Sequence, residues 1–218
     1  MKHTNHFVPW FRSVAPYANA FRGKIFVIAF SGNMVTNQKF VDFIHDINLL
    51  ASLGVQLVLT HGQHSEISAQ QKSIIDHETL QDLKASSGRI HFEISAQLSM
   101  GLPNSPMANA AIRVASGNFI TARPIGIING VDLMYAGEVR KTNTQAIRAR
   151  LEQSEVVLLS PLGYSPTGEI FSLALKEVAT EVAVALNADK LIFLTDGMLD
   201  IDDQTSSLSH ELTVADCK

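Results

Sequence analysis

Continuous apolar runs alternate along the chain with segments in which apolar residues recur every three or four positions. Such runs are typical of strands buried on both faces, as in a parallel sheet covered by helices, and the longer spacing is typical of helices. We expect strands at 24–30, 55–60, 156–159, 170–173 and 190–195, and helices at 8–21, 40–50, 78–84, 90–98, 146–153 and 176–186. The strand at 190–195 is expected to be buried like the others. The order strand, helix, strand in the first part predicts a right-handed βαβ unit and an α/β fold.

Turn-forming residues refine this prediction at three places. Pro16 lies inside the first expected helix and should kink or split it, because proline cannot donate the backbone hydrogen bond. Asn129-Gly130 lies between apolar runs, which is a strong hairpin signal. Ser116-Gly117-Asn118 is interpreted in the same way. We therefore expect some antiparallel pairing between residues 112 and 139.

Composition and charge exclude several classes of protein. Lys and Arg total 17 against 21 Asp and Glu, a net charge of −4, with no basic block of the kind that a nucleic-acid-binding face needs. No run approaches the length of a bilayer span, and the first residues lack the apolar core of a signal peptide. The single cysteine, Cys217, provides neither a disulfide framework nor a thiolate metal cluster. A cytoplasmic α/β protein that binds neither nucleic acid nor membrane is the expectation.

Candidate chemistry gathers where two of the expected strands end. Gly32 follows the first strand and Gly62 the second, and open parallel sheets bind ligands at this edge. The alternative is two ordinary strand-ending turns. His61 and His64 have the spacing of two zinc ligands, but no third ligand is evident, and we expect no metal site.

Paired carboxylates are the other candidate chemistry. Asp76 with Glu78, or Glu177 with Glu181, could form a catalytic pair. Exposed helix faces explain them equally well.

The order of short motifs along nearly the whole chain resembles the amino-acid-kinase family. Within it the chain is similar to the N-terminal kinase-like domain of bacterial N-acetylglutamate synthases. The matching segments are 11–17, 21–24, 46–58, 98–100, 116–120, 130–132, 171–180 and 188–192. This resemblance implies a three-layer αβα sandwich with a mainly parallel open sheet, the carbamate-kinase-like fold. It also implies an arm helix in residues 1–22 and an incomplete, C-terminally truncated kinase-like domain in 23–218, without the acetyltransferase domain.

Several positions depart from the active kinases of that family. The lysine that stabilises the transferring phosphoryl group is replaced by Ala29 in the stretch that ends at Gly32. The glycine triplet after the second strand retains only Gly62, the substrate-binding arginine is Ser73, and the catalytic aspartate is Lys176. Phosphoryl transfer depends on positioned positive charge, metal ligands and close backbone approach. The resemblance therefore implies a catalytically silent domain.

In arginine-sensitive relatives the arm helix pairs two subunits and covers bound L-arginine. Tyr17, Ser13 and Lys190 are the positions that match this site. A planar guanidinium stacks well on an aromatic ring, which suits this role for Tyr17. The resemblance thus implies a regulatory and assembly domain in arginine biosynthesis, with L-arginine as effector and a homo-oligomer formed through the arm.

Two alternatives to this regulatory role stay open. One is an active kinase similar to acetylglutamate kinase, and the other is an oligomerisation fragment without a ligand. The resemblance implies no cofactor for this chain, since acetyl-CoA would be the co-substrate of the missing acetyltransferase domain.

Overall fold

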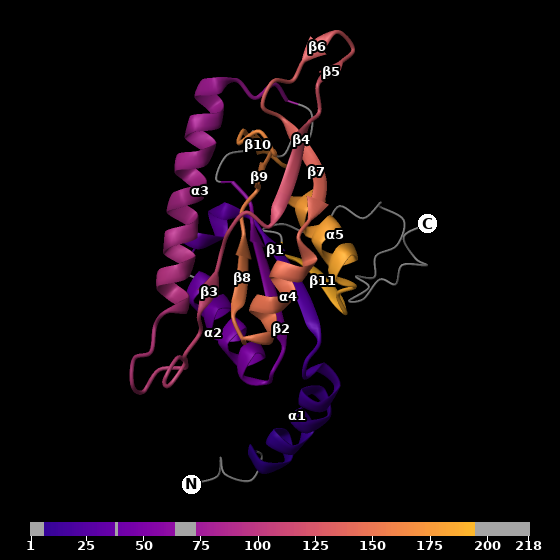
Figure 1. The fold of residues 1–218 in the computed structure, drawn as a ribbon. Coiled ribbons are helices and arrows are strands. Elements are labelled where there is room, and N and C mark those ends of the chain that lie inside the picture. The colour runs from indigo at the N-terminus through magenta and orange to yellow at the C-terminus, as the bar shows by residue number, and fades with distance from the viewer. Residues whose placement is uncertain (1–6, 38, 64–72, 195–218) are drawn as a thin grey trace, which may run out of the picture.

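The computed structural model describes residues 7–37, 39–63 and 73–194 (Figure 1). Two sheets and five α-helices make up the described chain. The elements in order are α1 (Phe7–Phe21), β1 (Ile25–Phe30), η1 (Gly32–Thr36), α2 (Lys39–Ser52), β2 (Gln56–His61), α3 (His77–Leu98), β3 (Val114–Ala115), β4 (Ile120–Pro124), β5 (Ile127–Ile128), β6 (Val131–Asp132), β7 (Gly137–Thr142), α4 (Thr144–Glu152), β8 (Val156–Leu159), β9 (Leu162–Tyr164), β10 (Ile170–Ser172), α5 (Leu175–Leu186) and β11 (Lys190–Leu194).

A five-stranded sheet with the order β11-β1-β2-β8-β3 forms the middle layer, and all its neighbouring strands are parallel. Every residue of β1 is buried because helices cover both faces of the sheet. Phe26 and Ile28 pack on the side of α2 and α3, whereas Val27 and Ala29 pack on the side of α4 and α5. The expected three-layer αβα sandwich with a mainly parallel sheet is confirmed.

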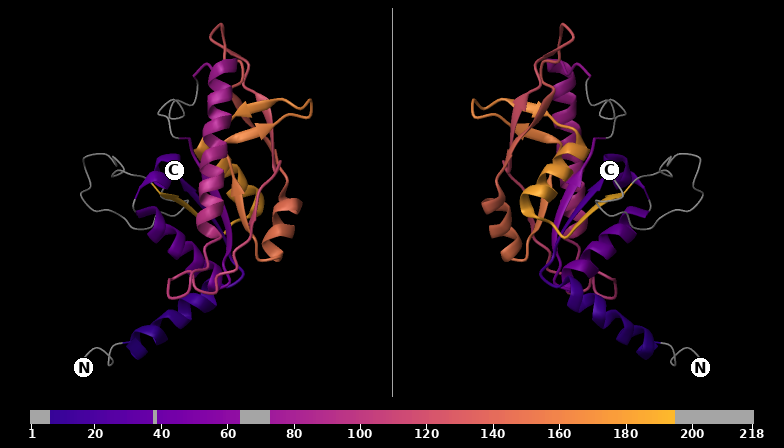
Figure 2. Two further views of the ribbon diagram at one scale, coloured as in Figure 1. Left: turned by 90° about the vertical axis from the view of Figure 1, so that its left-hand side faces the viewer. Right: turned by 90° about the vertical axis from the view of Figure 1, so that its right-hand side faces the viewer.

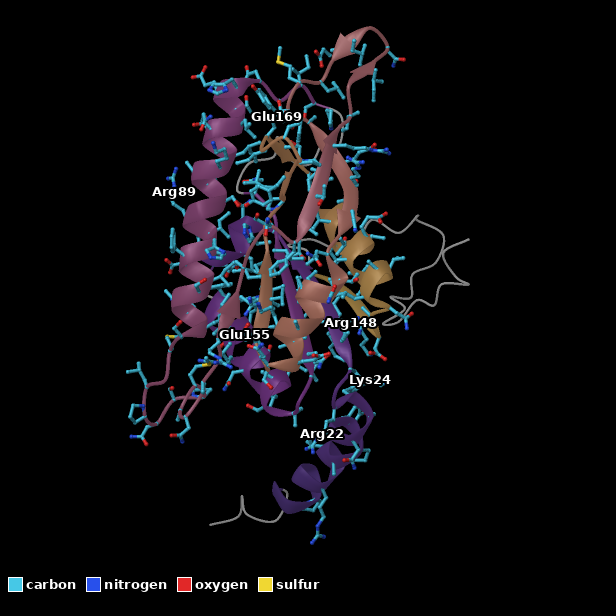
Figure 3. All side chains as sticks on the ribbon, in the orientation of Figure 1. Arg22, Lys24, Arg89, Arg148, Glu155 and Glu169 are labelled. Carbon is cyan, nitrogen blue, oxygen red and sulfur yellow. The ribbon has the colours of Figure 1, made fainter. Side chains whose placement is uncertain are left out.

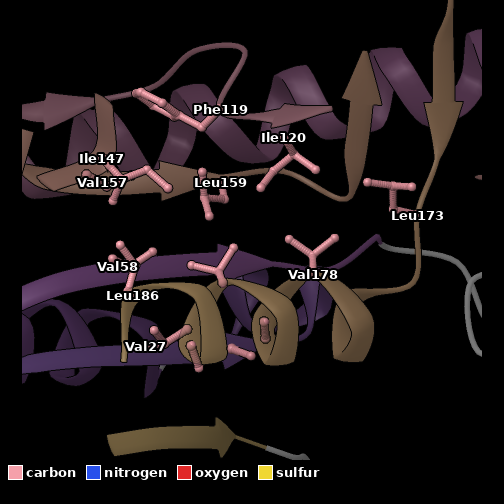
Figure 4. Packing of buried hydrophobic residues seen from close by; sticks show 14 of the residues in the cluster. Val27, Val58, Phe119, Ile120, Ile147, Val157, Leu159, Leu173, Val178 and Leu186 are labelled. Carbon is pink, nitrogen blue, oxygen red and sulfur yellow. The ribbon is translucent and has the colours of Figure 1, made fainter. Parts of the chain in front are cut away.

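The layer between the sheet and α5 shows how sequence spacing produces this packing (Figure 4). Val178 and Leu186 of α5 point toward Val27 and Val58 of β1 and β2, and all four side chains are fully buried. In a strand alternate residues share a face, and in a helix positions about one turn apart do so. The apolar runs and the helical spacing therefore meet in one core.

A second, four-stranded sheet with the order β10-β9-β4-β7 lies toward the upper end of the molecule in Figure 1. The β5–β6 hairpin extends beyond it, and its turn residues Asn129 and Gly130 have φ angles of 51° and 80°. The prediction of a hairpin at this turn is confirmed. The hairpin predicted at Ser116–Asn118 is wrong, because β3 pairs with β8 in the first sheet while β4 belongs to the second.

The prediction of two helices at 78–84 and 90–98 is also wrong, since α3 is one helix of 22 residues. Ser87 and Gly88 suggested a break. In the structure Ser87 is buried in line with Leu83 and Ile90, so the helix continues along one packed stripe. The first helix is likewise a single element, with Pro16 inside it.

β11 departs from its expected environment. The sequence predicted a buried strand, but each of its residues is at least partly exposed, and Phe193 is 41% exposed. Within the described part of the chain β11 has one neighbour, β1, and therefore forms an edge of the sheet. Its apolar run is that of an interior strand, whereas its position is not.

α1 projects from the opposite end of the molecule to the β5–β6 hairpin (Figures 1 and 2). Its last residue, Phe21, packs beside the cluster that contains Phe26, and the N–H of Gly23 donates to the carbonyl of Gly54 over 2.7 Å. Among the helices described, none has the length and apolar character that crossing a membrane requires.

Candidate functional site

The ends of β1 and β2 lie against each other at the carboxyl edge of the parallel sheet. The N–H of Gly62 donates to the carbonyl of Phe30 over 2.8 Å. A Cβ atom added at Gly32 would lie 2.7 Å from the carbonyl oxygen of Gly62 and 2.9 Å from the carbonyl carbon of Gln63. Gly32 is therefore needed for close backbone packing at this edge. The sequence analysis correctly brought Gly32 and Gly62 to one edge.

Three polar residues of β2 and the following turn are buried at the same edge: Thr60, His61 and Gln63. Nδ1 of His61 lies 3.0 Å from the carbonyl oxygen of Gly62. The hydroxyl of Thr60 and both amide atoms of Gln63 make no hydrogen bond. Unsatisfied polar groups destabilise a protein interior, so this edge has polar groups whose bonds the fold does not supply. The sequence gave no signal that Gln63 would be buried. His64, the second candidate zinc ligand, lies outside the described residues.

The N-terminus of α5 completes this edge. A Cβ atom at Gly62 would lie 3.2 Å from Cδ2 of Leu175, the first residue of the helix. Ala174 precedes the helix and provides no side-chain cap. Lys176 follows Leu175 with an exposed side chain. An ammonium group in this first turn is opposite in sign to the carboxylate that a helix N-terminus favours.

Glu177, the next residue, has a structural role that spacing did not reveal. Its Oε1 accepts a hydrogen bond of 2.6 Å from the N–H of Val139 in β7, beside a bulge in the β4–β7 pairing. Burial raises the pKa of Glu177, the bond from Val139 opposes this shift, and the nearby carboxylates of Glu138 and Glu181 add to it. Glu177 therefore joins α5 to the second sheet, and its sequence pairing with Glu181 gives a repulsive contact.

A second cluster of candidate residues lies where α1 meets β11. The ring centroids of Tyr17 and Phe21 are 6.5 Å apart, and Phe21 meets Phe26 edge to face at 5.3 Å. Nζ of Lys190 lies 5.1 Å from the centroid of Phe21, within the range of a cation–π contact. Tyr17 and Lys190, which the sequence analysis paired, thus both contact Phe21. Ser13 lies one helical turn before Tyr17 and shares its side of α1.

An ion pair fixes β11 beside this cluster. Asp189 accepts a hydrogen bond from the N–H of Ile25 over 2.9 Å and pairs with Nζ of Lys24 at 2.9 Å. Both interactions lower the pKa of Asp189, the bond with Lys24 most strongly. Lys24 is among the residues labelled in Figure 3, close to the end of α1. Asp189 therefore connects the start of β11 to the start of β1, and the sequence analysis missed this role.

Comparison with known protein families gives a match to the amino acid kinase family over residues 24–217. The chain belongs to the amino acid kinase family. The match begins two residues after α1 ends in the strand region, so it covers all of the described elements except the arm helix.

Individual relatives of this kinase-family chain point to one branch. It is 44% identical to an amino-acid acetyltransferase of Ralstonia nicotianae over 95% of this chain and 49% of the relative. A Pseudomonas fluorescens amino-acid acetyltransferase is 43% identical over 94% of this chain and 50% of the relative. The chain thus spans about half the length of these curated relatives.

Solved structures give the same result. N-acetylglutamate synthase from Neisseria gonorrhoeae, in complex with coenzyme A and L-arginine, superposes with a TM-score of 0.78 and 35% identity, covering 87% of this chain and 47% of that one. The protein smu.665 from Streptococcus mutans has a TM-score of 0.62 at 22% identity, covering 79% and 72%, and shares the fold.

The positions predicted to be degenerate in this kinase-family chain fall into two groups. Ala29, Gly32 and Gly62 lie at one edge of the sheet, and Lys176 begins the helix that contacts it. Ser73 instead lies two residues before Ile75, which forms a bridge with Met134 near the second sheet. Within the described ranges, no group of three or more His, Cys, Asp or Glu residues is placed to hold a metal ion.

An open pocket of about 690 Å³ lies between the start of α3 and the second sheet. Asp76, Tyr135 and Phe171 are among its lining residues. The carboxylate of Asp76 caps α3 by accepting a hydrogen bond of 2.8 Å from the N–H of Thr79, which lowers its pKa. Capping explains Asp76 without the catalytic pairing with Glu78.

Proposed function

We propose that this chain is a non-catalytic, kinase-like regulatory and assembly domain of an amino-acid acetyltransferase of arginine biosynthesis, with L-arginine as its effector. The observation that carries the proposal is the cluster of Tyr17, Phe21 and Lys190 between α1 and β11. The similarity to an N-acetylglutamate synthase in complex with L-arginine supports it. In the parent enzyme acetyl-CoA would acetylate glutamate in the cytoplasm, and no cofactor is assigned to the residues of this chain.

The chemistry of the α1–β11 cluster suits a guanidinium ligand. Lys190 already places a cation over the ring of Phe21, which is the position that a guanidinium would take against an aromatic face. Tyr17 is 64% exposed and adjoins the same ring, so its face is available to a ligand from solvent. Ser13 on the same side of α1 adds a hydroxyl group. The role of these three residues in binding is part of the proposal.

Catalytic silence follows from the edge of the sheet. Ala29 provides no cation for a phosphoryl group, and Lys176 provides no carboxylate for a metal ion. Gln63 is buried where the kinases of this family present a bare backbone. Phosphoryl transfer needs these charges and this close approach together.

Assembly is proposed to occur through α1, which projects from the body of the molecule (Figure 2). An amphipathic helix outside the core gains stability by packing against another surface. Removal of residues 1–22 should therefore lower the oligomeric state measured by light scattering.

Thermal unfolding with L-arginine tests the effector role. A ligand that binds only the folded state stabilises it by about 2.7 kcal/mol at a hundredfold excess over its dissociation constant. We expect L-arginine to raise the unfolding temperature of the chain, Tyr17→Ala to remove this response, and Tyr164→Ala to retain it. Tyr164 is a matched control because it is also exposed but lies in β9 of the second sheet.

Two other results would replace the proposal. A shift that requires Mg-ATP together with N-acetyl-L-glutamate, with formation of ADP, would favour an active kinase. The absence of any ligand response, with assembly that still depends on α1, would favour an oligomerisation domain without an effector.

A further inference from the structure

One long face of α3 is not covered by any other described element. Phe92, in the middle of this face, has the highest exposure among the large hydrophobic side chains described, at 74%. In the left-hand view of Figure 2, α3 runs in front of the rest of the molecule along its length. A helix of 22 residues is about 33 Å long, which is enough for an extended helix–helix contact.

The residues around Phe92 form a surface with a projection and an adjacent gap. Ala85, Gly88 and Ala96 follow helical spacing about Phe92 and therefore share its face. A Cβ atom added at Gly88 would meet no atom within 4 Å. The large ring of Phe92 thus lies one turn from a position where the helix backbone is open to close approach.

Two opposite charges border the same face. Arg89 and Glu93 are one turn apart, both are exposed, and neither forms an ion pair in the described part of the chain. Arg89 points away from the body of the molecule (Figure 3), and its Nε donates a long hydrogen bond of 3.4 Å to the carbonyl of Ala85. Both charges lie toward the same side of the line through Ala85, Phe92 and Ala96.

We propose that α3 packs antiparallel against α3 of a second copy of this chain, about a two-fold axis near Ile90 and His91. This symmetry places Arg89 of each copy opposite Glu93 of the other, because their positions are symmetric about residue 91. It also brings Phe92 of each copy toward the gap at Gly88 of the other. Such an isologous contact uses one patch twice, so a self-complementary surface favours a second copy over an unrelated partner.

This contact is independent of the arm. α1 and α3 are different elements at different ends of the described fold, and the face of α3 contains no residue of the α1–β11 cluster (Figure 1). The inference therefore does not rest on the effector role proposed above, and it assigns a second assembly surface to the chain.

Sedimentation of the full chain from about 1 µM to about 100 µM tests the inference. We expect Phe92→Glu to raise the dissociation constant of the dimer at least about thirtyfold, as loss of a central aromatic contact does. Val184→Glu is the matched control, because Val184 is 72% exposed on α5, and it should leave the constant unchanged.

Charge reversal distinguishes this pairing from a general loss of apolar surface. Arg89→Glu and Glu93→Arg should each weaken the dimer about tenfold, since each places like charges opposite one another. The double variant should restore wild-type association, because both copies then carry the exchanged pair. Association that Phe92→Glu leaves unchanged, a chain that is monomeric throughout the concentration range, or a double variant that fails to restore what the single variants lose would each overturn the inference.

Discussion

Replacing Gly32 by alanine tests whether the edge glycine is needed for packing alone. The added methyl group would lie 2.7 Å from the carbonyl oxygen of Gly62, 2.7 Å from Cδ1 of Ile90 and 2.9 Å from the carbonyl carbon of Gln63. Two of these three atoms are backbone and cannot turn aside. Overpacking of this kind costs about 1–3 kcal/mol, which lowers the unfolding temperature of a chain of this size by roughly 2–12 °C.

Calorimetry without any ligand measures this effect, and two other glycines provide the scale. At Gly62 the nearest atom to an added Cβ is a terminal methyl group of Leu175 at 3.2 Å, and at Gly117 it is a ring atom of Phe119 at 3.7 Å. We expect a large loss for Gly32→Ala, a smaller one for Gly62→Ala and almost none for Gly117→Ala. Equal unfolding temperatures for the Gly32 and Gly117 variants would refute the packing argument.

Three further predictions concern charges and the arm. The raised pKa of Glu177 means that the folded state retains its proton to higher pH than the unfolded state, so this residue makes stability fall as pH rises above about 4.5. Glu177→Gln, which still accepts the bond from Val139, should reduce that slope in urea titrations between about pH 4 and pH 7. The lowered pKa of Asp189 has the opposite sign, so its contribution is present above about pH 4 and is lost on acidification; Asp189→Asn should remove this acid sensitivity and lower stability at neutral pH. Phe21→Ala should cost about 2 kcal/mol in chemical unfolding, since its ring contacts both Lys190 and the core, whereas a cost near zero would contradict the anchoring of α1.

The central sheet could be predicted from the sequence because its signal is local. Six consecutive apolar residues from Ile25 to Phe30 need helices on both faces, and the helical spacing of the segments around Ile44 and Val182 provides them. The turn at Asn129-Gly130 was equally clear, since this pair readily adopts the positive φ angles of a tight hairpin.

Features that depend on distant neighbours were not predictable. The edge position of β11 follows from strand order, which its apolar run does not contain. The continuity of α3 across Ser87 depends on the core that receives this side chain. Burial of Gln63 and the bond from Val139 to Glu177 likewise join residues that pattern alone does not place together.

The structure also separates the glycines of the edge from the charges that phosphoryl transfer needs. Gly32 is explained by backbone contact with Gly62, so its presence is not by itself a sign of a phosphate site. Ala29 is 1% exposed and belongs to the apolar layer that α5 covers. A lysine at this position has a partner only when an anionic ligand occupies the edge, and a buried ammonium without one destabilises the fold. Once a chain of this fold no longer binds a phosphoryl donor, selection for stability alone favours a small apolar residue here, whereas the packing requirement at Gly32 persists. The retained glycine and the lost lysine are therefore consistent with a kinase fold kept for its shape.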